Sequence, residues 1–176
     1  PNCVFKINLS INAPYSDKLK KNNSITCMPR KLPQHYHLLM FYLKNRIPKN
    51  WKIDPIEEVD ENILISKIRR SKIFLSFSHF EGFGLPPLEA ALAGNKVIGY
   101  VGGGGKEYWK KPIFIKIEYG EILKFGETIL DEIKRYDKSW LNESKKQRKF
   151  LLKKYSTESE KKIFINFYKK IIQLYK

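Results

Sequence analysis

The chain of 176 residues has few acidic side chains, few cysteines and no long apolar run. Its two cysteines, Cys3 and Cys27, lack the spacing of a metal or redox site, and so few thiols favour a reducing compartment. No apolar run approaches the roughly 20 residues that a membrane-spanning helix needs. No secretory signal is recognisable at the N-terminus. We therefore expect a cytoplasmic domain, and since no initiator methionine is present, we expect it to begin inside a longer chain.

The shortage of acids leaves a formal net charge of +16, from 34 Lys and Arg against 18 Asp and Glu. Such a charge attracts phosphate groups of nucleotides, nucleic acids or anionic membranes. Lysine outnumbers arginine 28 to 6, however, whereas specific base and phosphate recognition favours arginine. The basic residues are spread along the chain without a recognition motif, so no nucleic-acid partner is expected. The basic run at residues 145–149 is interpreted as a solvated helix face, with peripheral contact to an anionic inner-membrane face as the alternative.

Apolar runs and helical periodicity alternate along most of the sequence. Strands are predicted at 25–28, 51–53, 72–77, 96–100 and 113–117, and helices at 33–46, 61–70, 86–93, 122–136, 139–153 and from 157 onward. This alternation predicts the α/β class: a Rossmann-like three-layer domain with a mostly parallel sheet and a helical C-terminal tail. We expect residues 1–24 to form a linker, 25–154 the domain and 155–176 a C-terminal helix, with Thr157 and Glu160 as a capping box.

The stretch SHFEGFGLPPLEAALAG, residues 78–94, joins a predicted strand to a predicted helix. Ligands of open α/β sheets bind beyond the carboxyl ends of the strands, where this stretch lies. Gly82 and Gly84 permit positive φ and close approach of the backbone to a ligand. The N-terminus of the helix carries a partial positive charge that suits a phosphate. Glu81 and Glu89 flank this turn, where their carboxylates can accept hydrogen bonds from sugar hydroxyls.

These residues resemble a known family. Glu81 and Glu89, separated by seven residues, resemble the E-x7-E donor-binding motif of the large group 1 family of retaining GT-B glycosyltransferases, which includes many bacterial polysaccharide and lipopolysaccharide sugar transferases. The run GGGGKE at residues 102–107 resembles the GG-x-x-E loop of that family. The resemblance covers residues 20–135 and the final helix. It implies that this chain is the C-terminal half of a GT-B fold, whose N-terminal, acceptor-binding domain is absent from this sequence.

The resemblance also implies residue roles. Glu81 would be the catalytic residue, in contact with hydroxyls of the transferred sugar, while Glu89 would hold the ribose. The basic pair lies where the family binds the diphosphate, but its members are adjacent here, so which of them binds stays open. The nucleobase would lie just after the second strand. The donor-binding set is therefore Arg30, Lys31, Pro55, Ile56, Gly82, Phe83, Gly84, Leu85, Glu89, Gly103 and Gly104. The glycine run at residues 102–105 could equally be a flexible loop without a ligand role.

The sequence thus favours the donor-binding half of a hexosyltransferase that moves a sugar, with retention, from a nucleotide-sugar to a glycan or lipid-linked acceptor. No metal or other cofactor is expected, because cations and the helix dipole would stabilise the leaving diphosphate. The isolated chain would be inactive without its N-terminal domain. The alternative is a non-catalytic or split-subunit nucleotide-sugar-binding module. A basic nucleic-acid-binding domain, indicated only by charge and aromatic content, is the last alternative. His79 is interpreted as a loop residue lining the cleft, and part of the apolar stripe of the last helix is expected to be exposed, because in the family that helix crosses to the N-terminal domain.

Overall fold

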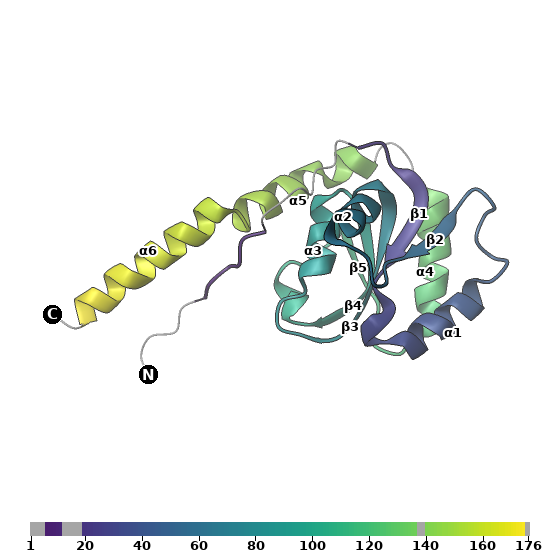
Figure 1. Ribbon diagram of the computed structural model, residues 1–176, viewed down its shortest axis with the longest axis horizontal. Coiled ribbons are helices and arrows are strands. Elements are labelled where there is room, and N and C mark those ends of the chain that lie inside the picture. Colours follow the sequence, from purple (N-terminus) through teal and green to yellow (C-terminus); the bar gives the residue numbers. More distant parts are fainter. Residues whose placement is uncertain (1–5, 12–18, 137–139, 175–176) are drawn as a thin grey trace.

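A five-stranded sheet forms the centre of the computed structural model, which describes residues 6–11, 19–136 and 140–174 (Figure 1). The strand order is β2-β1-β3-β4-β5, and all paired strands are parallel. The strands are β1 (Asn22–Cys27), β2 (Lys52–Pro55), β3 (Ser71–Glu81), β4 (Lys96–Gly103) and β5 (Phe114–Lys116). The central strand β3 is buried through Ser78 except at Lys72, which explains its nearly continuous apolar sequence.

Helices cover both faces of this sheet and create two separate cores. On one face lie α1 (Pro33–Leu43) and α4 (Ile122–Arg135), and on the other lie α2 (Glu61–Arg70), α3 (Leu85–Leu92) and α5 (Trp140–Lys154). Leu39 of α1 and Phe125 of α4 belong to the first core. Ile68 of α2, Leu88 of α3 and Leu151 of α5 belong to the second. The predicted three-layer, Rossmann-like α/β class is therefore confirmed, with a sheet that is parallel throughout.

The ends of β3 and β4 differ from the sequence prediction. The strand β3 continues to Glu81 rather than ending at Phe77, because its pairing with β4 resumes after a register shift between Ser78 and Glu81. The predicted glycine loop at residues 102–105 is wrong as well. Its first half ends β4, and its second half begins the short 3-10 helix η2 (Gly104–Glu107). A Cβ atom at Gly104 would collide with the carbonyl group of Gly82, so this run closes tightly against the stretch after β3.

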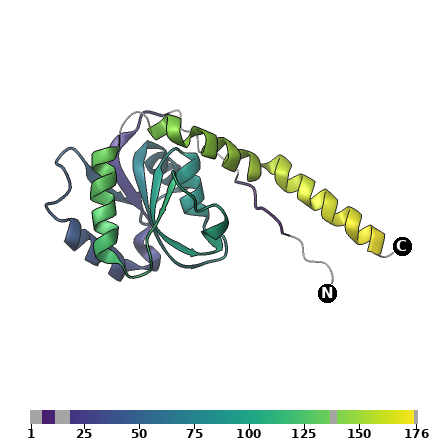
Figure 2. The ribbon, with the colours of Figure 1, turned by 180° about the vertical axis from the view of Figure 1, so that it is seen from behind.

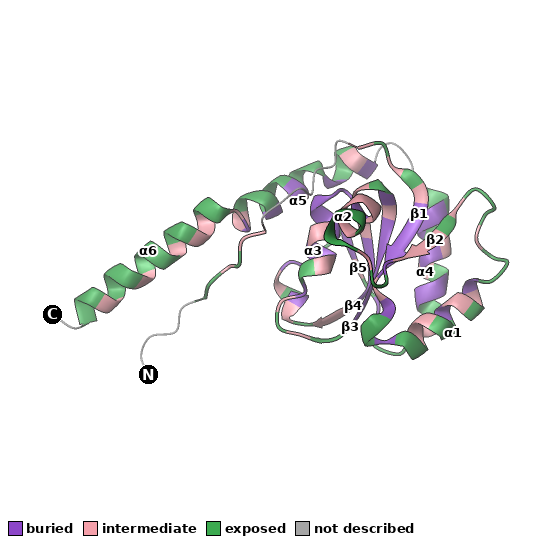
Figure 3. Cartoon of the chain, viewed as in Figure 1, coloured by how far each residue is buried: buried purple, intermediate pink, exposed green. Residues whose placement is uncertain are grey.

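The helices α5 and α6 (Thr157–Leu174) form an arm that leaves the body of the molecule (Figures 1 and 2). Buried Trp140 and Leu151 hold α5 against the domain, whereas α6 has no buried residue (Figure 3). The exposed apolar stripe of the last helix is thus confirmed; its exposed members are Phe164, Ile165, Tyr168, Ile172 and Leu174. No helix in the described ranges is long and apolar enough to cross a membrane.

Two local predictions on this arm need correction. The capping side chain of α6 is Ser156 rather than Thr157, since the Ser156 hydroxyl accepts a hydrogen bond of 3.1 Å from the amide of Ser159. The basic run at residues 145–149 is only partly a solvated face. Arg148 is buried because its guanidinium turns inward and donates a 2.9 Å hydrogen bond to the carbonyl oxygen of Leu141.

Candidate functional site

The order of the strands places a crevice beside β1. From β1 the chain moves outward to β2 and then returns to β3 on the other side of β1. The helices that follow β1 and β3, which are α1 and α3, therefore pack on opposite faces of the sheet. Open α/β sheets bind ligands at such a topological switch point, beyond the carboxyl ends of the strands.

A cavity of about 1020 Å³ occupies this switch point. Residues that follow β1, β2 and β3 line it together. Seven residues of the predicted site are among them: Arg30, Lys31, Ile56, Glu81, Phe83, Gly84 and Leu85. Sequence reasoning missed several other lining residues, including Met28, Glu57, Glu58, Ser76 and Ser78. The acids Glu57 and Glu58 directly follow Ile56, so the position predicted for the nucleobase could have drawn attention to them.

The remaining predicted residues lie near the cavity without lining it. Glu89 is half-buried one turn into α3, and Pro55 ends β2. Gly82 and Gly103 are exposed, and a Cβ atom added to either would meet no other atom within 4 Å. Gly104 packs on Gly82 instead of facing the cavity. The backbone around Gly104 therefore packs directly against the backbone around Gly82.

An ion pair joins two of the residues that line the cavity. The ammonium group of Lys31, in the short 3-10 helix η1 (Pro29–Lys31), contacts Oε1 of Glu81 at the end of β3. The Glu81 side chain is only 18% exposed. Arg30 is exposed at the same cavity and forms no ion pair with any residue in the described ranges. One cation is thus engaged with a carboxylate, while its neighbour is available to an anionic ligand.

The N-terminus of α3 opens onto the cavity through Gly84, whose φ of 78° is left-handed. Pro86 and Pro87 bring no N–H group to the first turn, so the amide of Leu85 is the donor that the helix offers there. A cavity that binds an anion must therefore depend strongly on side-chain cations. This raises the importance of Arg30 and Lys31 beyond that of the helix dipole.

Tyr108, which sequence reasoning missed, fixes the turn before α3. Its hydroxyl lies 2.6 Å from the carbonyl oxygen of Gly84, to which it donates, and 3.0 Å from that of Phe83. Burial, with a smaller contribution from the charges of Glu81 and Glu107, raises the pKa of Tyr108, so its hydroxyl stays protonated as a donor. The available signal was its place directly after the run GGGGKE at residues 102–107.

Glu107, the acid of the run GGGGKE, is tied to the junction between α5 and α6. Its carboxylate accepts a 2.9 Å hydrogen bond from the hydroxyl of Tyr155 and forms ion pairs with Lys6 and Lys154. Burial alone would raise the pKa of Glu107, but the hydrogen bonds from Lys6 and Tyr155 and the nearby positive charges lower it overall. Glu107 therefore anchors η2 and does not line the cavity.

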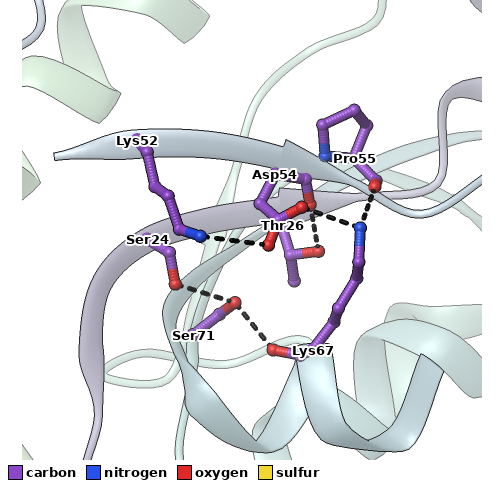
Figure 4. A network of polar contacts seen from close by, with 7 residues as sticks. All are labelled: Ser24, Thr26, Lys52, Asp54, Pro55, Lys67 and Ser71. Atoms are coloured by element: carbon purple, nitrogen blue, oxygen red, sulfur yellow. Dashed lines mark hydrogen bonds and ion pairs between the residues drawn. The ribbon is translucent and has the colours of Figure 1, made fainter. Parts of the chain in front are cut away.

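A polar network fixes the end of β2, directly before the cavity residue Ile56 (Figure 4). The ammonium group of Lys67 on α2 donates to Oδ1 of Asp54 at 2.7 Å and to the carbonyl oxygen of Pro55 at 2.8 Å. Thr26 of β1 donates to the Asp54 carbonyl oxygen at 2.8 Å, and the amide of Ile56 donates to that of Cys27. The backbone that leads into the cavity at Ile56 is thus held by α2 and by β1.

His79 does not line the cavity, contrary to its interpretation as a cleft residue in a loop. It belongs to β3 and is exposed, because the register shift between Ser78 and Glu81 turns it outward. Its ring lies 4.7 Å from that of Tyr119 and 5.0 Å from that of Phe80, measured between centroids. No role of His79 in the cavity follows from this position.

Comparison with known proteins adds three structural likenesses. A variant of TarM from S. aureus, in complex with fondaparinux, α-GlcNAc-glycerol and UDP, matches 92% of this chain and 38% of its own, at 18% identity and a TM-score of 0.72. The C-terminal domain of a group 1 family glycosyltransferase, LpcC from Francisella tularensis, matches 86% of this chain and 97% of its own, at 17% identity and a TM-score of 0.64. The pneumococcal O-GlcNAc transferase GtfA with UDP and GlcNAc matches 93% and 38%, at 14% identity and a TM-score of 0.57.

No family model and no curated protein matches the sequence. At these identities the structural likeness establishes a shared fold. The chain spans little more than a third of the length of TarM and GtfA, while it corresponds to nearly the whole C-terminal domain of LpcC.

Proposed function

We propose that this chain is the donor-binding part of a glycosyltransferase and that its cavity holds a nucleotide-sugar. One observation carries the proposal: a single cavity at the switch point brings Arg30, Lys31 and Glu81 together with the N-terminus of α3. Cations and a helix N-terminus suit a diphosphate, and a neighbouring carboxylate suits sugar hydroxyls. The shared fold with solved glycosyltransferases supports the same proposal.

The donor would lie along the cavity from β2 to β3. Its base would occupy the end near Ile56, where the polar network of Figure 4 fixes the backbone. Its diphosphate would lie between Arg30 and the amide of Leu85. Its sugar would reach Glu81, whose carboxylate would accept hydrogen bonds from hydroxyl groups. Glu89, which does not line the cavity, keeps its proposed ribose contact only if its side chain turns toward the ligand.

In the proposed reaction the bond between the anomeric carbon and the diphosphate oxygen breaks, and an acceptor hydroxyl oxygen forms the new bond on the same face of the sugar. The acceptor proton passes to the leaving diphosphate, whose charge Arg30 and Lys31 stabilise. The acceptor would be a glycan or a lipid-linked saccharide. It would bind on an N-terminal GT-B domain, so the chain alone is expected to bind nucleotide and to transfer nothing.

The first test measures nucleotide binding by this chain. Thermal unfolding with UDP, GDP, ADP or dTDP, followed by calorimetric titration, should reveal a stabilising nucleotide and identify the base. Arg30→Gln should lower the affinity for that nucleotide about tenfold, a loss of ~1.4 kcal/mol in binding free energy. The matched control is Arg135→Gln, which removes the same charge from the exposed end of α4 and should leave affinity unchanged. Absence of binding by all four nucleotides would contradict the proposal.

Transfer is tested by joining the chain to an N-terminal domain of the GT-B type and supplying the matching nucleotide-sugar with saccharide acceptors. A product with the same anomeric configuration as the donor is expected. A product of opposite configuration would contradict retention while leaving donor binding intact. Nucleotide binding without transfer by any such pairing would favour the non-catalytic binding module instead.

A further inference from the structure

A second concave surface lies on the sheet face opposite α2 and α3. It is a groove of about 500 Å³ between α1 and α4. It shares no lining residue with the cavity described above. Its lining consists of Leu38, Phe41, Tyr42, Lys44, Asn45, Arg46, Ile122 and Leu123. We call this set of residues the α1–α4 groove.

The α1–α4 groove presents large apolar side chains to solvent. Phe41 is 79% exposed, Leu123 is 66% exposed and Leu38 is 56% exposed. These three side chains come from two different helices that pack against each other, so they form one surface. A cluster of exposed apolar groups of this kind, bordered by polar residues, is typical of a contact surface.

The charged residues that line the groove have one sign. Both charged residues that line it, Lys44 and Arg46, are cations, and the Arg46 guanidinium lies 4.4 Å from the centroid of the Tyr42 ring. The sequence from residue 29 to residue 53, which includes all of α1, contains no Asp or Glu. Glu121, the residue directly before α4, forms an ion pair of 3.7 Å with Lys124.

We propose that the α1–α4 groove docks this chain on an anionic lipid surface. Phe41, Leu38 and Leu123 would enter the boundary between headgroups and acyl chains, while Lys44 and Arg46 would meet lipid phosphates. A second copy of the chain is a poorer occupant, because two such cationic faces on chains of net charge +16 repel each other. The proposal rests on residues outside the nucleotide cavity and does not depend on the proposed function.

Sedimentation with lipid vesicles tests this docking. The chain should bind vesicles of phosphatidylcholine that contain roughly a quarter phosphatidylglycerol, and binding should fall sharply in high salt. Lys44→Gln combined with Arg46→Gln should lower the partition coefficient about tenfold or more. Phe41→Ser combined with Leu123→Ser, at exposed positions where folding is little affected, should do the same.

The matched control removes two exposed cations from α5 instead. Lys145→Gln combined with Lys149→Gln changes the net charge by the same amount and should keep most of the binding. An equal loss in this control would overturn the proposal, because attraction would then depend on total charge alone. Equal binding to pure phosphatidylcholine would also overturn it. So would a dimer, detected by analytical ultracentrifugation, that the Phe41 and Leu123 substitutions abolish.

Discussion

Lys31 and Glu81 are fifty positions apart in the sequence, yet they form an ion pair in the lining of the cavity. Lys31 follows β1 and Glu81 ends β3, so the pair bridges the two strands that define the switch point. In the proposed function each partner has another task, Lys31 toward a diphosphate and Glu81 toward sugar hydroxyls. A bound donor would therefore compete with this ion pair for both side chains.

The two partners should consequently respond differently to substitution. Glu81→Gln removes the carboxylate that competes for Lys31, so a nucleoside diphosphate without sugar should bind at least as tightly as before. Lys31→Met should lower the affinity for the same ligand about tenfold, or ~1.4 kcal/mol in binding free energy. Calorimetric titration of both variants provides the measurement. Lys116→Met and Glu118→Gln, which break an exposed ion pair of 2.6 Å elsewhere, should both be neutral. Equal weakening by Glu81→Gln and Lys31→Met would contradict the competition.

Alanine substitutions at the glycines around the turn before α3 should differ sharply in their effect on the free energy of unfolding. Gly84→Ala forces a left-handed φ on alanine and places its Cβ 2.8 Å from the Tyr108 hydroxyl oxygen, so it should lower the free energy of unfolding by more than about 1 kcal/mol. Gly104→Ala should be at least as harmful, since its Cβ would collide with the Gly82 carbonyl group. Gly82→Ala is the control, with no other atom within 4 Å of the added Cβ. Urea denaturation of the three variants checks the ranking.

Tyr108→Phe isolates the hydrogen bond to Gly84 from the packing of the ring. Loss of this buried bond should reduce the free energy of unfolding by about 1 kcal/mol. It should also weaken nucleotide binding, because the carbonyl groups of Phe83 and Gly84 lose their fixed position at the cavity. Tyr168→Phe, at an exposed position on α6, should change neither quantity. Unchanged stability and binding in Tyr108→Phe would mean that the turn is held by packing alone.

The sheet and the position of the cavity were predictable because both follow from local patterns. Alternating apolar runs and helical periods define the strands and helices, and the strand before Ser78 delivers Glu81 and Gly84 to the ligand edge of the sheet. The partner of Glu81 was not predictable. A contact between residues fifty positions apart depends on which strands are neighbours, and neither the order β2-β1-β3 nor the register follows from a hydrophobic pattern.

The remaining errors each have a local structural cause that the sequence pattern does not show. Four consecutive glycines look like a flexible loop, but Gly104 needs its missing Cβ so that its backbone can approach Gly82. His79 looks like a cleft residue because it precedes Glu81, yet a register shift in β3 turns it outward. Arg148 looks like part of a solvated basic run, yet a carbonyl group within its own helix accepts its hydrogen bond and allows its burial.

Acid should weaken the end of β2 through Asp54. The hydrogen bond from Lys67, opposed in part by burial, lowers the pKa of Asp54 below its ordinary value of 3.8. A carboxyl group whose pKa is lower in the folded state stabilises the fold above its unfolded pKa, and this contribution is lost as the pH falls through the folded pKa. Stability should therefore decline below about pH 4, and Asp54→Asn should show a smaller decline.

Urea denaturation at pH 7 and at pH 3 measures the difference. The control Asp131→Asn removes an exposed α4 carboxylate and should leave the decline unchanged. If the free energy of unfolding falls as steeply in Asp54→Asn as in the parent chain, other carboxylates cause the acid destabilisation.

Within the arm, α6 should be dispensable for folding, whereas α5 should be required. No residue of α6 is buried, whereas Trp140, Leu151 and Tyr155 belong to the core that α3 and β4 share. A chain that ends after Ser156 should therefore keep the free energy of unfolding to within about 1 kcal/mol, with the lost contacts limited to those such as the hydrogen bond between Ser10 and Glu160. A chain that ends before Trp140 should unfold, because it exposes the apolar surface that α5 covers. Urea denaturation monitored by circular dichroism distinguishes the two truncations. A large loss of unfolding free energy in the chain that ends after Ser156 would mean that α6 packs on the domain in solution. Its exposed apolar stripe would then not be available to another domain.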